Sequence, residues 1–159
     1  MMTTELNQRF EAAIAAIDAA NAADPNTLQV GGISRPKELA HAEMLTALVK
    51  QLRPEASEQL LLAARAHHIR RWVHPRSSFP AGRIGYLRWR KELHEFHANE
   101  TRRILLGVGY DEEIADRVSE IVQKRGLGRD DEVQAFEDGL CLVFLETQFD
   151  ELSARTERS

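Results

Sequence analysis

Residues 60–72 read LLLAARAHHIRRW, an apolar, alanine-rich run that ends in two adjacent histidines and two arginines. Leu60, Ala64 and His67 or His68 recur at helical spacing, so the run is expected to form a helix with a histidine at the end of its inner face. A single histidine on an apolar face is usually a satisfied core residue. The histidines therefore indicate a functional site only if polar groups from other helices lie beside them.

Apolar residues at helical spacing predict further helices on both sides of this run. The six predicted helices cover about residues 4–20, 36–52, 54–72, 84–106, 112–124 and 131–152. Gly31-Gly32, between two short stretches with β-branched residues, is a weak signal for a two-residue hairpin turn. The sequence thus predicts an all-α bundle of about six helices, with a short hairpin near residues 28–33.

The size and composition of the chain favour one globular domain. The 159 residues and 18.0 kDa fit a single domain spanning residues 1–159, with a core over about residues 4–152. No apolar run reaches the ~18 residues that a membrane span needs, and the polar N-terminus is unlike a signal peptide. Cys141 is the one cysteine, which excludes an internal disulfide and a zinc site of several thiolates. We therefore expect a cytoplasmic protein that does not contact membranes.

Charge is unevenly distributed along the chain. The total is 21 basic and 25 acidic residues, yet residues 65–91 contain eight basic side chains and no acidic one. A basic stretch in an acidic protein indicates a local anion site, and the net charge of -4 makes nucleic acid an unlikely partner. The alternative is a solvated helix face whose arginines pair with acidic residues elsewhere.

Three polar groups fall on the apolar faces of three predicted helices: His41, the pair His67-His68, and Asp138. A buried carboxylate costs several kcal/mol unless a cation or hydrogen-bond donors compensate it. Imidazole and carboxylate ligands together suit Mn, Fe, Ni or Zn. The three groups together are therefore a better candidate for a metal site than any one of them alone.

The order of these residues resembles a known superfamily. Residues 62–69 (LAARAHHI) are similar to the "AAxLHDI" helix of the HD-domain metal-dependent phosphohydrolases, and residues 104–114 to the turn between that superfamily's central helices. The resemblance covers about residues 37–146. Residues 35–40 (RPKELA), 67–72 (HHIRRW) and 85–90 (GYLRWR) are closer still to the domain-of-unknown-function family 4202, whose activity is not established.

The resemblance to the HD domains implies a fold and a ligand set. It places His41 as the first ligand, His67 as the histidine of the His-Asp pair, and Asp138 as the final aspartate. His68 stands where the superfamily has aspartate, so it would bind through nitrogen or leave the site weak. One divalent transition metal (Mn, Fe, Ni or Zn) is the expected cofactor.

Two functions remain open from the sequence. The first is a metal-dependent phosphohydrolase acting on a nucleotide or small phosphoester, with metal ligands His41, His67, His68 and Asp138. The phosphate would be held by four arginines, Arg70, Arg71, Arg83 and Arg88. The alternative is a non-catalytic anion- or nucleotide-binding regulatory protein on a degenerate HD-like scaffold. Val143 and Phe144, off the main apolar stripe of the last helix, could form a homodimer contact.

Overall fold

The structure is a computed structural model that describes the backbone of residues 2–158 and the side chains of residues 4–148. Over that range it is an all-α bundle of six α-helices and one hairpin, as predicted. The helices are α1 (Met2–Ala22), α2 (Lys37–Leu52), α3 (Glu58–Ala66), α4 (Arg83–Gly107), α5 (Glu112–Val122) and α6 (Asp131–Arg158). Within the described residues, no helix combines the length and the apolar character that a bilayer crossing requires.

The hairpin joins α1 to α2. Its strands β1 (Thr27–Val30) and β2 (Ile33–Pro36) pair antiparallel, with Val30 opposite Ile33. The turn residues Gly31 and Gly32 have φ values of +57° and +81°, which glycine adopts without the steric cost of a Cβ atom. The Gly-Gly signal in the sequence therefore predicted this turn correctly.

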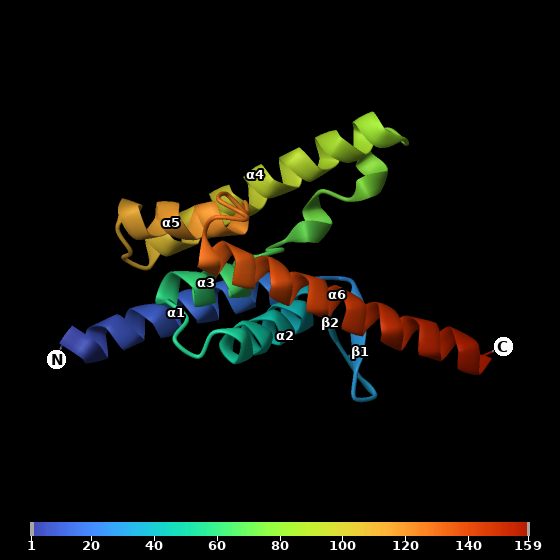
Figure 1. Cartoon of the computed structure of the whole chain (residues 1–159), viewed down its shortest axis with the longest axis horizontal. Helices are drawn as coiled ribbons and strands as arrows, with labels where there is room; N and C mark the ends of the chain where they lie inside the picture. The colour runs from blue at the N-terminus through green and yellow to red at the C-terminus, as the bar shows by residue number, and fades with distance from the viewer. Residues whose placement is uncertain (1, 159) are drawn as a thin grey trace.

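Helix α3 lies at the centre of the bundle and contacts α1, α2, α5 and α6 (Figure 1). Leu60, Leu62, Ala63, Ala64 and Ala66 are all fully buried. The small alanine side chains let four neighbouring helices approach a single short helix closely. The alanine-rich run in the sequence thus marks the centre of the core.

The predicted limits of this central helix, about residues 54–72, are wrong at both ends. Ser57 is the N-cap and accepts a hydrogen bond from the Leu60 N–H, so the helix begins at Glu58. It ends at Ala66 because the chain turns at Arg70, where φ is +53° and the N–H donates to the Asn21 side chain at 3.2 Å. The two adjacent histidines therefore lie in a turn just beyond the helix.

The predicted inner face of the last helix is also wrong. Phe136, Gly139 and Val143 face the core, whereas Asp138, Cys141, Leu142 and Leu145 are exposed; Phe149 lies outside the described side chains. At Gly139 an added Cβ would lie 2.7 Å from a methyl group of Leu45 on α2. This close approach of α2 fixes the rotation of α6 and turns Asp138 outward.

The segment between α3 and α4 contains two 3₁₀ turns, η1 (Arg71–Val73) and η2 (Arg76–Ser78). The Arg76 guanidinium donates to the carbonyl oxygens of Phe79, Pro80 and Gly82 at 3.3, 2.9 and 3.2 Å. After this loop, the first half of α4 projects away from the bundle (Figure 1). The last half of α6 also extends beyond the bundle, in a different direction from α4 (Figure 1). Of this loop, Arg71 lines the space between the two helices.

We predict that Gly85→Ala destabilises the fold by about 1–3 kcal/mol, as overpacking does. Gly85 is buried, and an added Cβ would overlap the Pro80 carbonyl oxygen, which Arg76 holds in place. Urea unfolding measures the change. The control is Gly107→Ala on the same helix, where an added Cβ meets nothing within 4 Å. Equal stabilities of the two variants would contradict the close packing at Gly85.

Candidate functional site

Four histidines and one glutamate from three elements form the central polar group of the fold, here called the His–Glu cluster. Glu38 and His41 lie one turn apart on α2, His67 and His68 follow α3, and His97 comes from α4. The His41 Nδ1 lies 3.1 Å and the His68 Nδ1 3.8 Å from the same Glu38 carboxylate oxygen. The His68 ring centroid is 4.2 Å from that of His67 and 5.7 Å from that of His97.

Hydrogen bonds at Nδ1 fix the orientation of the imidazoles in this cluster. The His97 Nδ1 donates to the Ile69 carbonyl oxygen at 2.9 Å, and the His67 Nδ1 donates to a backbone carbonyl at 3.0 Å. A carbonyl oxygen only accepts, so in these neutral rings the Nε2 atom carries the lone pair. The Nε2 atoms of His41 and His97 are buried and have no hydrogen-bond partner in the described residues.

Burial keeps the imidazoles of His67, His68 and His97 neutral. Desolvation lowers the pKa of His67 well below 6.5 and that of His97 from 6.5 to about 3. It also lowers the pKa of His68, against the opposing effect of Glu38. For Glu38 itself, burial raises the pKa, but hydrogen bonds with His41 and His68 outweigh it and hold the pKa well below its ordinary range. The cluster thus pairs a carboxylate anion with imidazoles that offer lone pairs at neutral pH.

The cluster forms the inner end of a cleft of about 730 Å³ between α4 and α6, here called the larger cleft. Its inner end is formed by His67, His68 and His97. Its α4 wall consists of Tyr86, Trp89, Arg90, Leu93 and His94. Its α6 wall consists of Phe136, Glu137, Leu140, Cys141, Phe144 and Leu145, and Arg71, Val122 and Lys124 complete the lining. The cleft is therefore apolar and aromatic along its walls and polar at its inner end.

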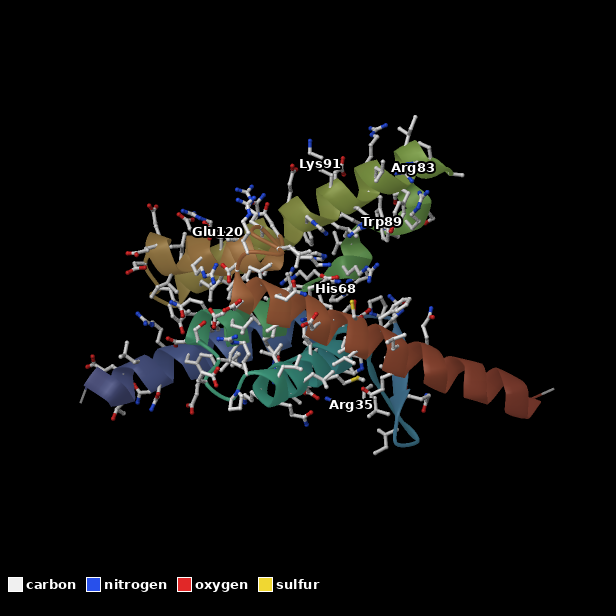
Figure 2. The ribbon with its side chains drawn as sticks, viewed as in Figure 1. Arg35, His68, Arg83, Trp89, Lys91 and Glu120 are labelled. Atoms are coloured by element: carbon white, nitrogen blue, oxygen red, sulfur yellow. The ribbon has the colours of Figure 1, made fainter. Side chains whose placement is uncertain are left out.

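Arg71 connects the aromatic wall to the histidines. Its guanidinium lies over the Trp89 ring at 5.4 Å, and its Nη1 is 3.5 Å from the His68 Nδ1. The Trp89 Nε1 donates to the His74 carbonyl oxygen at 2.8 Å, which fixes the ring. Figure 2 shows Trp89 on the side of α4 that faces His68. Lys124, in contrast, is neutralised by Glu137, whose carboxylate lies 2.6 Å from its Nζ.

A second space of about 490 Å³, the smaller cleft, lies next to the larger cleft. The hairpin side of this cleft consists of Asp24, Pro25, Asn26, Lys37 and Glu38. Its opposite side consists of Arg71, Trp72, His74, Pro75, Arg76 and Trp89. Arg71 and Trp89 line both clefts, so the two spaces adjoin at this pair.

Comparison with known proteins adds a family to this geometry. A model of a domain of unknown function, DUF4202, matches residues 11–159. The chain belongs to the DUF4202 family. A search of curated proteins and a search of solved structures each found no match. The resemblance of the sequence to family 4202 is thereby confirmed, and the DUF4202 family carries no assigned activity in its description.

The predicted metal ligands of this DUF4202 chain come together only in part. His41, His67 and His68 all belong to the His–Glu cluster. Asp138 does not line the cleft: it is exposed on α6 and accepts a hydrogen bond from Gln134 at 2.9 Å. Within the part of the chain that the structure describes, no group of three or more His, Cys, Asp or Glu side chains is arranged to hold a metal ion.

The predicted phosphate-binding arginines are likewise divided. Arg71 lines both clefts, whereas Arg83 and Arg88 are exposed on the projecting half of α4 and line neither. Arg70 also lies outside both clefts, with its Nε 4.0 Å from a Glu100 carboxylate oxygen. Arg90 lines the larger cleft instead. The basic stretch at residues 65–91 contains all of these arginines, so the sequence pattern alone does not tell which of them line a cleft.

Two members of the site were not selected from the sequence, Glu38 and His97. Glu38 precedes His41 by three residues, the spacing that places two side chains on one helix face, and this signal could have identified it. His97 follows His94 by three residues, a spacing that places both on one helix face and can hold a metal, but it was not among the predicted ligands. Its contact with Ile69 joins residues that are 28 positions apart, and such a contact cannot be derived from helical periodicity.

We predict that the metal-free protein loses stability as the pH falls below about 6.5, the ordinary pKa of histidine. The His97 pKa is about 3 in the fold, so below pH 6.5 the unfolded chain binds protons that the folded chain does not. At about pH 5.5 one such histidine costs about 1.4 kcal/mol relative to neutral pH. Urea unfolding in EDTA at about pH 7.5 and about pH 5.5 measures this difference.

The matched variant is His97→Asn, whose side-chain N–H can replace the Nδ1 donor to Ile69 but does not titrate. It should reduce the loss of stability between the two pH values. Asn99→Gln, at an exposed position on the same helix, changes no titratable group and should leave the loss unchanged. An undiminished loss in His97→Asn would show that His97 is not kept neutral by burial.

Proposed function

We propose that this protein is a phosphohydrolase that acts on a nucleotide or a small phosphoester bound in the larger cleft. One observation carries the proposal: a cleft with aromatic walls ends at a guanidinium group and a cluster of neutral imidazoles. Such a cleft offers stacking surface for a flat organic group, a cation for phosphate, and polar groups beside the phosphorus. The resemblance to the HD-domain phosphohydrolases supports the same reaction class.

Arg71 is the residue best placed to bind the phosphate. A guanidinium group can donate two parallel hydrogen bonds to phosphate oxygens, and Trp89 beneath Arg71 limits the movement of the group. The Tyr86 and Trp89 ring centroids are 5.9 Å apart, so a flat organic group in the cleft would meet two aromatic surfaces on α4. Arg90 supplies a further cation on the same wall.

His68 lies beside Arg71 at the inner end of the cleft. Its Nδ1 is 3.5 Å from the Arg71 Nη1 and 3.8 Å from a Glu38 carboxylate oxygen. His97, whose pKa is about 3, remains unprotonated at neutral pH. It can accept a hydrogen bond from water or bind a metal through Nε2.

One divalent transition metal, Mn, Fe, Ni or Zn, remains the expected cofactor, but not with the predicted ligand set. Asp138 does not fit, because it is exposed on α6 and bonded to Gln134. The donor chemistry of His41 and His97 does fit: each ring is held through Nδ1, and each buried Nε2 has no partner among the described residues. A metal held there would polarise a phosphoryl oxygen and lower the pKa of a bound water.

The alternative function is a non-catalytic, anion- or nucleotide-binding regulatory protein. The observation that favours it is the position of Asp138, because an HD-like scaffold without its final carboxylate ligand would bind metal weakly. In that case the clefts would still bind an organic phosphate through Arg71 and the aromatic walls. Metal-dependent turnover separates the two functions.

We predict that the protein hydrolyses p-nitrophenyl esters of phosphate when supplied with one of the four metals. His97→Asn should lower kcat by about 10- to 100-fold and reduce bound metal, as the loss of a metal-site residue does. Arg71→Gln should chiefly raise KM, because it removes the phosphate fork. Activity assays together with elemental analysis of the purified protein provide the measurement.

The control is Asp138→Asn, which should retain the activity and metal content of the parent because Asp138 is exposed. Activity and metal lost in Asp138→Asn but retained in His97→Asn would restore the ligand set predicted from the sequence. Tight phosphate binding without turnover under any metal would establish the regulatory alternative instead.

A further inference from the structure

We infer that the substrate is a phosphodiester that spans the Arg71–Trp89 pair, with one organic group in the larger cleft and the other in the smaller cleft. The inference rests on the proposed phosphohydrolase function and narrows its substrate class. A phosphomonoester carries one organic group and would leave one of the two clefts unused. A diester carries two organic groups on one phosphorus, and the two clefts offer two separate spaces for them.

The two clefts meet at the groups that would act on phosphorus. Arg71 and Trp89 line both spaces. His68 lines the larger cleft and Glu38 the smaller cleft, and their closest N and O atoms are 3.8 Å apart. The boundary between the clefts is therefore also the position of the guanidinium group and of the His–Glu cluster. A phosphate at this boundary would direct one ester group into each cleft.

The charge at the boundary matches a diester. Among the described residues, Arg71 is the one cationic side chain that lines both clefts. Lys124 in the larger cleft is paired with Glu137, and the Arg76 guanidinium in the smaller cleft donates to three backbone carbonyl oxygens. Arg90 and Lys37 each line one cleft alone. A phosphodiester carries one negative charge, whereas a monoester carries about two at neutral pH. The buried Glu38 carboxylate beside the boundary would further disfavour a dianion.

Each cleft can also accommodate a flat organic group. The larger cleft, of about 730 Å³, has Tyr86 and Phe144 on opposite walls. The smaller cleft, of about 490 Å³, has the rings of Trp72 and Trp89 in its lining. Both volumes lie within the range of small-molecule sites in proteins. The site is thus built for two aromatic groups joined by one phosphate.

The reaction is the addition of water across one ester bond. The water oxygen forms a bond to phosphorus, and the bond from phosphorus to one ester oxygen breaks. The departing oxygen leaves as an alcohol or phenol with one proton of the water. The other proton is carried by the phosphate of the monoester product or is released to solvent. No oxidant or reductant is required.

Three probes test the inference on the unmodified protein: bis(p-nitrophenyl) phosphate, methyl p-nitrophenyl phosphate and p-nitrophenyl phosphate. They carry two aromatic groups, one aromatic and one methyl group, and one aromatic group alone. Relative to the uncatalysed rates, kcat/KM should be about tenfold higher for the first probe than for the other two, because an aromatic group fills the smaller cleft. Quenching of tryptophan fluorescence gives the affinity of each probe independently of turnover.

Two variants test which cleft is responsible for the preference for the first probe. Trp72→Leu alters the smaller cleft alone and should remove the advantage of the first probe while changing kcat/KM of the other two by less than about twofold. Phe144→Ala alters the larger cleft alone and should weaken all three probes by a similar factor, because each places an aromatic group there. Since the probe series uses the unmodified protein, the inference remains testable if Trp72→Leu does not fold.

The outcomes separate this inference from the proposed function. Turnover of all three probes with no preference for the first, or an equal loss for all three in Trp72→Leu, would overturn the diester and leave the phosphohydrolase in place. Absence of turnover with every probe would overturn the phosphohydrolase. In that case, affinity about tenfold higher for the first probe would support a two-group ligand, and equal affinities would overturn it.

Discussion

The buried carboxylate of Glu38 is the contact on which the rest of the site depends. The Glu38 backbone N–H donates to the Asp24 carboxylate at 2.9 Å, and this hydrogen bond holds the first turn of α2 against the loop after α1. Its side chain lies against His41 on its own helix and against His68 after α3. A carboxylate buried to this degree is stable only with such partners, so the fold requires the imidazoles to be where they are.

The second constraint is the turn that follows α3. Asn21 on α1 accepts the Arg70 N–H, and the left-handed conformation at Arg70 ends the helical path. This turn presents His67 and His68 to α2 and α4, and it places Arg71 over Trp89. The polar inner end and the aromatic wall of the larger cleft therefore depend on a few residues of one turn. Substitutions at Asn21 would therefore alter the site, although Asn21 lines neither cleft.

Much of the fold could be predicted from the sequence because it is expressed in local patterns. Helical spacing of apolar residues gave six helices, and the Gly31-Gly32 pair gave the hairpin turn. Asp111 caps α5 by accepting the Ile114 N–H at 2.9 Å, as its side chain and position favour. The limits of α3 were wrong because its end is set by Asn21, a residue far away in the sequence.

The sequence by itself determined the all-α class and the alanine-rich central helix. It also identified three residues of the His–Glu cluster among the four that were predicted as metal ligands. Only the tertiary structure decided which neighbours face inward. Asp138 and Glu137 are adjacent on α6, and the close contact of Gly139 with Leu45 turns Glu137 to the cleft and Asp138 to solvent. Successive side chains on a helix point in directions that differ by about 100°. The rotation of the helix about its axis, which packing sets, therefore decides which of two adjacent residues faces the cleft.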